Sequence, residues 1–287
     1  MARCTLSVNA TASDSGLDDV GQRCPGKALV TRFLGFVYGV ATYLIFLATF
    51  VYAIGFVGDI AVPQSLDGPA TGSWPRSLLI DLGLLSLFAL QHSGMARVSF
   101  KTRLAQLIDP AIERTTFVLA SSVALGALIA FWQPLGGVVW SIENSVARAV
   151  LYAGFACGWG VVVIATFLIN HFELFGLQQV WRNLRGLRPV SPTFVTPLFY
   201  RVVRHPLYAG FVLAFWCTPT MTAAHLLFAV MTTAYILVAI QLEERDLLRA
   251  HPEYALYRER VPMLLPRRSG AGHRADAETL AKERSVG

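Results

Sequence analysis

The stretch Arg204-His205-Pro206-Leu207-Tyr208-Ala209-Gly210 opens an apolar run that ends at Gln241, where Glu243-Glu244-Arg245-Asp246-Leu247 follows. The run is longer than the roughly twenty apolar residues that cross a bilayer, and Thr218-Pro219-Thr220 offers a turn within it. If the run folds back at this turn, the basic residues at its start meet the glutamates at its end on one membrane face. The stretch therefore predicts a helical hairpin with a charged site at its base, suited to a ligand that carries both a carboxylate and a cation.

The composition of the whole chain also indicates a membrane protein. Hydrophobic residues make up 54% of the 287 residues and charged residues 15%, and the mean hydropathy is +0.52, outside the usual range of a soluble domain. Four further segments approach or reach the length of a transmembrane helix, near 33–57, 78–95, 116–132 and 146–169. We predict an all-α integral membrane protein with five to six transmembrane helices, including the C-terminal hairpin, and short cytosolic helices.

Arginine and lysine residues alternate along the chain as the positive-inside rule requires. They gather before the first apolar segment, after the second and after the fourth, whereas the intervening loops hold only Arg76 and Arg148. Both termini are therefore expected in the cytosol. Topology and contact with anionic lipid explain the net charge of +6, so we expect membrane lipid, and no nucleic acid, as a partner.

The two ends of the chain differ from the rest. Residues 1–29 and 267–287 are polar and lack an apolar core, which predicts a disordered N-terminal arm and a disordered C-terminal tail. The membrane domain then covers 30–266. The four cysteines show no metal-ligand spacing, and we expect neither a metal site nor a structural disulfide.

The segment Asn170-His171-Phe172-Glu173-Leu174-Phe175-Gly176-Leu177-Gln178-Gln179-Val180-Trp181 follows the fourth apolar segment. Its apolar and aromatic residues alternate with His, Glu and Gln, which is typical of a segment at the membrane interface. Ionisable groups at the edge of the hydrocarbon are candidates for function, and we interpret His171 and Glu173 in this way. The alternative is that both side chains reach the headgroups or cap the end of a helix.

The start of the hairpin has the features of an anion site. Pro206 fits the first turn of a helix, whose free N–H groups and positive dipole end favour a carboxylate. Arg201 and Arg204 are three residues apart and can face the same way, and Gly210 allows a ligand or a neighbouring helix to come close. The alternative is that His205-Pro206 only marks a helix start and that the arginines anchor the cytosolic side.

The end of the hairpin carries carboxylates against the basic trend of the other cytosolic segments. Glu243 and Glu244 can accept hydrogen bonds from hydroxyl groups or pair with an ammonium, whereas pairing with arginines along the helix is the alternative. Farther on, Tyr254, Tyr257 and Arg258 follow within a short predicted helix. Aromatic faces there can cover a planar base or a sulfonium.

Polar residues within the predicted crossings give weaker signals. His92, in Gln91-His92-Ser93-Gly94 near the inner end of the second crossing, can line a substrate cavity or make an interhelical hydrogen bond. Asp81 and His225 fall near the outer face, and we interpret them as structural.

Together, the 204–210 stretch, Glu243-Glu244 and the Tyr254, Tyr257 and Arg258 segment resemble the C-terminal cofactor site of isoprenylcysteine carboxyl methyltransferases. That wider family includes phospholipid methyltransferases and proteins linked to nitrite and nitric oxide metabolism. The resemblance implies S-adenosylmethionine as methyl donor, bound by the hairpin at the cytosolic face within 170–266. The residues implied in binding it are Tyr200, Arg201, Arg204, His205, Pro206, Tyr208, Gly210, Glu243, Glu244, Tyr254, Tyr257 and Arg258.

The family also implies a role for several of these residues. Arg204 and His205 would hold the methionyl carboxylate of the donor, and Glu243, with Glu244, its ribose or ammonium. Tyr208 and Gly210 would shape the pocket. The C-terminal tyrosines and Arg258 would close over it.

Within that family, the 170–181 segment, Gln91-His92-Ser93 and the overall length are similar to bacterial methanethiol S-methyltransferases, which make dimethyl sulfide. This likeness implies a bacterial inner-membrane enzyme that methylates a small thiol. The thiolate is the nucleophile and histidine titrates near neutral pH, so His171 is the expected base, and Glu173 is the second catalytic candidate. Residues implied for the acceptor site are His92, Phe175, Gln178 and Trp181.

Two other functions remain open from the sequence. A methyltransferase of the same family can act on a lipid or an isoprenylcysteine, which requires a lateral opening between helices. A non-enzymatic accessory protein of nitrogen-oxide metabolism would not bind the donor at all.

Overall fold

The computed structural model describes residues 25–70, 72–188 and 197–266, and structural statements below refer to these. The predicted tail lies outside this part of the chain, and so does most of the predicted arm. Residues 25–29, the last of that arm, belong to the first helix, which begins at Pro25.

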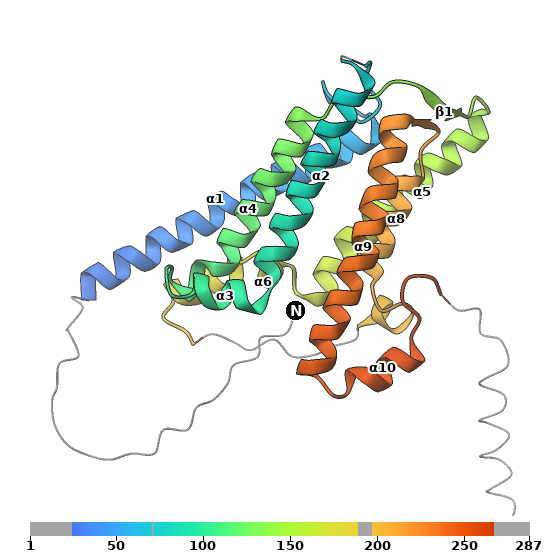
Figure 1. The fold of residues 1–287 in the computed structure, drawn as a ribbon. Coiled ribbons are helices and arrows are strands. Elements are labelled where there is room, and N and C mark those ends of the chain that lie inside the picture. The colour runs from blue at the N-terminus through green and yellow to red at the C-terminus, as the bar shows by residue number, and fades with distance from the viewer. Residues whose placement is uncertain (1–24, 71, 189–196, 267–287) are drawn as a thin grey trace, which may run out of the picture.

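The described chain is almost entirely helical (Figure 1). Its five long helices are α1 (Pro25–Gly58), α2 (Trp74–Ala96), α4 (Pro110–Phe131), α5 (Ser145–Ile169) and α9 (Ala223–Ala250), and each is long and apolar enough to cross a membrane. The shorter helices are α3 (Val98–Leu104), α6 (His171–Leu174), α7 (Leu177–Leu184), the 3-10 helix η1 (Leu198–Arg201), α8 (Pro206–Trp216) and α10 (Tyr254–Arg260). The prediction of an all-α, multi-pass membrane protein is confirmed.

The predicted C-terminal hairpin forms, but its two arms differ in length. α8 has 11 residues, about half of what a spanning helix needs, whereas α9 has 28. Beyond α8 the chain becomes extended, and strand β2 (Thr220–Thr222) pairs antiparallel with β1 (Val138–Ser141). Pro219 and the β-branched threonines around it disfavour a helix, so the first arm continues from a short helix into an extended segment that ends beside β1.

α8 packs closely against α5 through facing glycines. A Cβ atom added at Gly158 would lie 2.6 Å from the Ala214 nitrogen and 2.8 Å from the Gly210 oxygen. Small residues let two helix backbones approach in this way. Gly154 likewise faces Cys217, and Gly210 faces Val162, so residue numbers rise along α5 as they fall along α8 and the helices are antiparallel. One further turn in each helix brings Thr166 of α5 level with Pro206 of α8.

The end of the bundle opposite the hairpin base holds the aromatic core and a small group of buried hydrogen bonds. Phe56 and Trp132 are almost fully buried there. Thr222 Oγ1 donates to Asp67 Oδ1 at 2.7 Å, and His225 Nδ1 lies 2.9 Å from Asp67 Oδ2. These bonds join the loop after α1 to the start of α9, in keeping with a structural role for His225.

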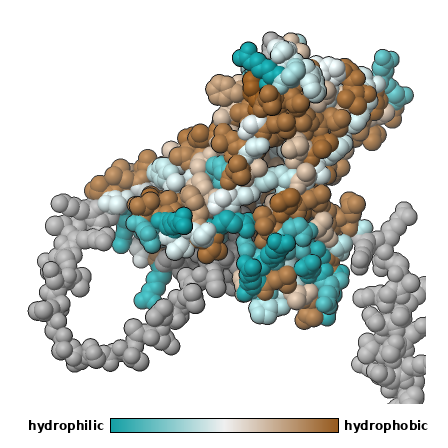
Figure 2. Space-filling view, in the orientation of Figure 1, coloured by the Kyte–Doolittle hydropathy of each residue, from teal (hydrophilic) through white to brown (hydrophobic). Residues whose placement is uncertain are grey.

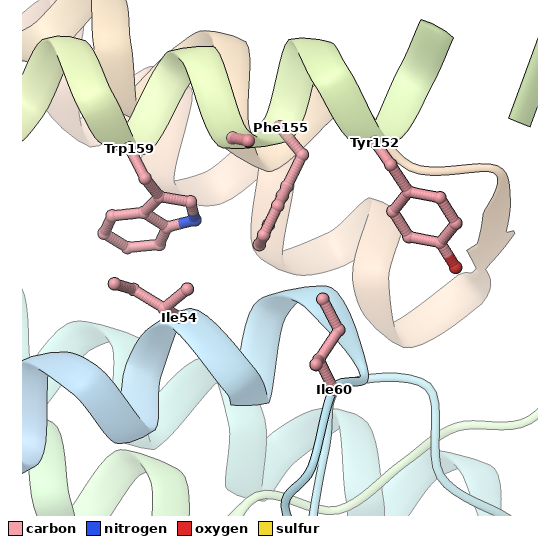
Figure 3. A pocket seen from close by; sticks show the side chains of 6 residues that line it. Ile54, Ile60, Tyr152, Phe155 and Trp159 are labelled. Atoms are coloured by element: carbon pink, nitrogen blue, oxygen red, sulfur yellow. The ribbon is translucent and has the colours of Figure 1, made fainter. Parts of the chain in front are cut away.

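Hydrophobic side chains cover the long helices, and hydrophilic ones gather around α10 in the view of Figure 2. Leu79 and Leu90 of α2, for example, are 71% and 75% exposed, as expected for helices that face lipid. An apolar groove between the end of α1 and α5 is lined by Ile54, Ile60, Tyr152, Phe155, Ala156 and Trp159 (Figure 3). The polar groups in this lining are the Tyr152 hydroxyl and the Trp159 N–H, and its other side chains are apolar.

Candidate active site

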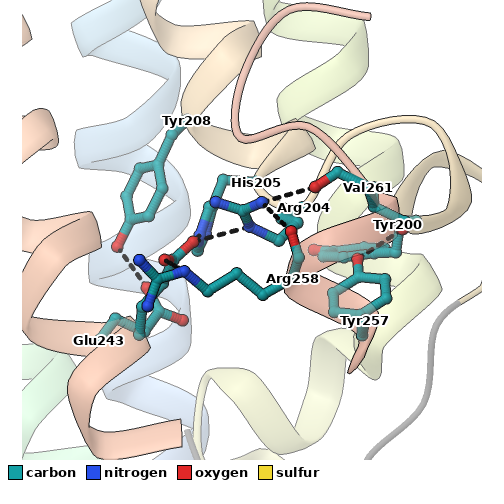
Figure 4. Close-up of polar contacts among 9 residues, drawn as sticks. Tyr200, Arg204, His205, Tyr208, Glu243, Tyr257, Arg258 and Val261 are labelled. Carbon is teal, nitrogen blue, oxygen red and sulfur yellow. Dashed lines mark hydrogen bonds and ion pairs between the residues drawn. The ribbon is translucent and has the colours of Figure 1, made fainter. Parts of the chain in front are cut away.

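Glu244 is the buried centre of a cluster of ionisable side chains at the hairpin base, formed with Arg204, His205 and Arg258, which Figure 4 labels. Its side chain is almost fully buried, and its Oε1 accepts a hydrogen bond from Arg204 Nε at 2.8 Å. His205 Nε2 lies 3.0 Å from the same oxygen, and Arg258 Nε lies 3.4 Å from Oε2. A buried carboxylate needs such basic partners because it has lost its hydration. The structure thus brings together the two ends of the hairpin, as the sequence predicted. We call these four residues the Glu244 cluster.

Arg204 also fastens the start of α8 to the segment after α10. Its Nη1 donates to the carbonyl oxygens of Arg258 at 2.9 Å and Val261 at 2.5 Å. The backbone N–H groups of Arg204 and His205 donate to Pro262 and Met263 at 2.8 and 3.1 Å. The guanidinium therefore binds other groups of the same chain, and its role toward a ligand carboxylate stays a prediction.

Glu243 differs from Glu244 in its surroundings. Tyr208 Oη donates to Glu243 Oε2 at 3.0 Å, and the carboxylate is only half-buried. Within the described part of the chain, no arginine or lysine forms an ion pair with it. Glu243 thus presents uncompensated negative charge beside the Glu244 cluster, as a site for a ligand cation requires.

The tyrosines around the cluster are neutral hydrogen-bonding groups. Tyr257 donates to the backbone oxygen of Tyr200, and the Tyr254 and Tyr257 ring centroids are 5.6 Å apart. Burial raises the pKa of Tyr257 to about 12 and the pKa values of Tyr200 and Tyr254 above their usual range. Tyr254, the first residue of α10, is 2% exposed, whereas Arg258 is 48% exposed in its side chain.

The remaining residues predicted for the donor site take different places. Arg201 is exposed at the end of η1, and Pro206 is buried as the first residue of α8. Gly210 faces α5, where an added Cβ atom would lie 2.8 Å from the Gly158 oxygen. Of the two explanations given for Gly210, close approach of a neighbouring helix is the one that the structure shows.

His171 lies in a second cluster, formed with Tyr43 of α1, Thr166 and Phe167 of α5, and Phe175. Tyr43 Oη is 2.8 Å from His171 Nε2, and Thr166 Oγ1 is 2.8 Å from Nδ1. The ring stacks on Phe167 with centroids 4.3 Å apart and lies 4.8 Å from Phe175. Burial lowers the pKa of His171 below its usual value of 6.5, so the imidazole is neutral at pH 7 and able to take up a proton. We call these five residues the His171 cluster.

Asn170 turns the chain from α5 into α6 and holds the other predicted residues of this segment. Its φ of +126° lies in a region that side chains other than glycine rarely adopt. Its amide nitrogen donates to Glu173 Oε2 at 3.0 Å and to Gln178 Oε1 at 2.8 Å. Glu173 and Gln178 are thus bound to Asn170, whereas Trp181 is exposed and packs near Phe36.

His92 lies in separate surroundings. Its Nδ1 is 3.1 Å from Ser121 Oγ, and its ring stacks on Phe88 with centroids 5.4 Å apart. Arg114 connects this region to α6, because its guanidinium lies over Phe117, a ring neighbour of His92, and its Nε donates to the Leu174 oxygen at 2.7 Å. Among the described hydrogen bonds, none joins His92 to the His171 cluster.

The two clusters lie on neighbouring helices at the same level of the bundle. Thr166, which contacts His171, is level with Pro206, the residue after His205. Packed helices are about 8–10 Å apart, and the facing glycines bring this pair close. A neutral histidine after α5 and a charged cluster at the start of α8 thus lie toward the same end of this helix pair.

Sequence reasoning did not assign roles to Tyr43, Thr166 or Asn170. Tyr43 is a phenol inside the first apolar segment, and Thr166 precedes His171 by about one helical turn. Polar groups within a membrane helix are candidates for function, but only the fold shows that these two lie against the same imidazole.

Comparison with known proteins identifies relatives that are similar to this chain over most of its length. The chain is 50% identical over 246 residues to "Methanethiol S-methyltransferase" of Crocosphaera subtropica, covering 85% of this chain and 96% of that protein. It is 50% identical over 236 residues to the protein of the same name from Mycobacterium tuberculosis, covering 82% and 97%. A more distant relative is "Nurim" of Xenopus laevis, 27% identical over 204 residues, 64% of this chain and 70% of that protein.

No family model matches the chain, and no solved structure does. The similarity to the bacterial relatives extends over nearly their whole length. The resemblance drawn from the sequence is confirmed. The chain belongs to the methanethiol S-methyltransferase family of membrane methyltransferases.

Proposed function

We propose that this protein transfers a methyl group from S-adenosylmethionine to methanethiol and so forms dimethyl sulfide. The single observation that supports it most is the neutral imidazole of His171 at the level of the Glu244 cluster, in a chain of this family. We further propose that the site faces the cytosol from the bacterial inner membrane, with both termini cytosolic and with lipid around the exposed apolar helices.

The residues around the Glu244 cluster fit the donor. Glu243, uncompensated and held by Tyr208, suits the ammonium or the ribose hydroxyls. The start of α8, with His205 and Arg204 beside it, suits the carboxylate. Tyr257 and Arg258 lie at the exposed side, where they are able to cover the bound molecule. When bound, the donor supplies a sulfonium methyl group that is already activated, so the chain mainly has to align it with the acceptor.

The His171 cluster fits the acceptor. Methanethiol must lose its proton, because the thiolate is the nucleophile, and a neutral histidine is a suitable base at pH 7. Phe167, Phe175 and the Tyr43 ring give the apolar surroundings that a small methyl thiol requires. Glu173, held by Asn170 beside this cluster, is the second ionisable group at hand.

The direct test is incubation of purified protein with S-adenosylmethionine and a panel of acceptors, with headspace detection of methylated sulfides. We expect dimethyl sulfide from methanethiol. Methylation of a lipid or an isoprenylcysteine instead would contradict the proposed acceptor, and a protein that binds no S-adenosylmethionine would contradict methyl transfer altogether.

His171→Gln should lower kcat by about 10²- to 10⁴-fold, the usual contribution of a general base. In the wild type, activity should fall as the pH drops through the His171 pKa, which burial places below 6.5, because the protonated ring cannot accept the thiol proton. That acid limb should vanish from the residual activity of the variant. His251→Gln, at a histidine that pairs with Glu253 near α10, is the control. Full turnover of His171→Gln across the pH range would show that the base is another group.

Glu243→Gln should weaken binding of S-adenosylmethionine by about tenfold or more, since a hydrogen bond to a charged group contributes about 1.5–3 kcal/mol. Calorimetric titration of the purified variant measures this. The matched control is Glu259→Gln, an exposed carboxylate on α10. Equal affinities of the two variants would place the donor's cation away from Glu243.

A further inference from the structure

The hydrogen bonds around His171 determine which ring nitrogen carries the proton. Thr166 Oγ1 lies 2.7 Å from the backbone oxygen of Val163, to which it donates. Its hydroxyl proton is therefore committed, and toward His171 Nδ1, 2.8 Å away, the same oxygen acts as acceptor. Nδ1 must then be the N–H group.

The other nitrogen is consequently the basic one. A neutral imidazole has a single N–H, so Nε2 has a free lone pair, and Tyr43 Oη at 2.8 Å donates to it. The Tyr43 and His171 rings are nearly perpendicular, at 86° with centroids 5.8 Å apart. The lone pair that has to take up the acceptor's proton is thus occupied by the Tyr43 hydroxyl.

We propose that Thr166 fixes His171 as the Nδ1–H tautomer and that the Tyr43 hydroxyl relays the acceptor's proton to Nε2. This inference rests on the proposed function, because it concerns the proton that a thiol loses on methylation. Thr166 is a positioning residue, since it acts through His171. Tyr43 is a catalytic residue, since its oxygen would contact the reacting thiol.

The step balances without any further reactant. The thiol S–H bond breaks and its proton passes to Tyr43 Oη, while the proton of Tyr43 passes to His171 Nε2. The electron pair left on the thiol sulfur forms the new bond to the methyl carbon, and the bond from that carbon to the donor sulfur breaks with its pair remaining on that sulfur. His171 ends as an imidazolium and Tyr43 as a neutral phenol.

The surroundings of Tyr43 suit this relay. The ring lies among the aromatic side chains of Phe46 and Phe175, with centroids 6.1 and 6.3 Å away. Among the described residues, no other side chain is recorded within hydrogen-bond distance of the Tyr43 oxygen. That oxygen retains a lone pair for an incoming S–H group, and apolar rings lie around it.

The test compares Tyr43→Phe with Tyr38→Phe, a matched variant on the same helix whose hydroxyl donates to Thr116 Oγ1 at 3.2 Å. We expect Tyr43→Phe to lower kcat for methanethiol by about 10²-fold or more with KM for the donor unchanged. Because the lost hydrogen bond favoured the neutral ring, the acid limb of the residual activity should move to higher pH. Tyr38→Phe should stay within about twofold of wild type. Wild-type kcat and an unmoved pH profile in Tyr43→Phe would overturn the relay.

The tautomer has its own readout, independent of turnover. In protein labelled with ¹⁵N-histidine, the His171 signals should show a protonated Nδ1 and an unprotonated Nε2. Thr166→Val should shift the ring toward the Nε2–H form, whereas Thr49→Val, at a threonine that also bonds a backbone oxygen, should not. A protonated Nε2 in the wild type would overturn the assignment. Wild-type protein that makes no dimethyl sulfide but shows the expected tautomer would contradict the proposed function and the relay, and leave the positioning role of Thr166 standing.

Discussion

Glu244→Ala should destabilise the protein by about 3–5 kcal/mol, the usual cost of removing one partner from a buried ion pair. The glutamate is 3% exposed, and its loss leaves the Arg204 guanidinium and the His205 ring buried without their carboxylate. The same change loosens α9 from the start of α8, so donor binding should be lost as well. Thermal unfolding in detergent, together with calorimetric titration of S-adenosylmethionine, measures both effects.

Two further variants separate charge from shape at this position. Glu244→Gln keeps an oxygen that accepts from Arg204 Nε, so it should cost less than Glu244→Ala. Glu259→Ala, at an exposed position on α10, should leave the unfolding temperature unchanged. If Glu244→Ala unfolds at the wild-type temperature, the cluster does not hold the hairpin base together.

Gly158→Ala should destabilise the contact between α5 and α8 by about 1–3 kcal/mol, the range for overpacking a tight interface. The new Cβ atom would lie 2.6 Å from the Ala214 nitrogen, and a backbone atom cannot move aside as a flexible side chain does. α8 must shift, which changes the level of Pro206 relative to Thr166. Turnover should therefore fall together with the unfolding temperature.

Gly160→Ala is the matched control for this prediction. It lies on the same helix, and an added Cβ atom there would meet nothing within 4 Å. Alanine favours a helix over glycine by about 1 kcal/mol, so this variant should be as stable as the wild type or slightly more stable. Similar unfolding temperatures for Gly158→Ala and Gly160→Ala would mean that α5 and α8 move apart to accommodate the added Cβ atom without loss of stability.

The sequence predicted the class, the spanning segments and the meeting of the hairpin ends, because each depends on a local pattern. Apolar length identifies a spanning helix, and a fold-back of one run brings its two ends together whatever the details. It overestimated the helical part of the first arm of the hairpin, since the 207–241 run is apolar throughout. The pairing of β2 with β1, about eighty residues earlier in the sequence, is a long-range contact that no local pattern reveals.

In the candidate site, too, the sequence identified single residues but not the contacts between them. The individual residues 171, 204, 243 and 244 could be chosen by charge and position, but their partners could not. Arg204 binds Glu244 and the backbone after α10, and Tyr43 of the first helix contacts His171. Both sets of contacts depend on how the helices pack. Packing also decided that Gly210 faces a helix.

The hydrogen bonds from Arg204 and His205 to residues 261–263 have a consequence for biosynthesis. All five spanning helices have been translated once α9 is complete at Ala250, yet the backbone that closes the base of the ligand site follows only later. A nascent chain can therefore be fully inserted in the membrane while its site is still open. A chain stopped before Val261 should reach the membrane and remain there as an inactive protein, so quality control that detects only failed insertion would not remove it.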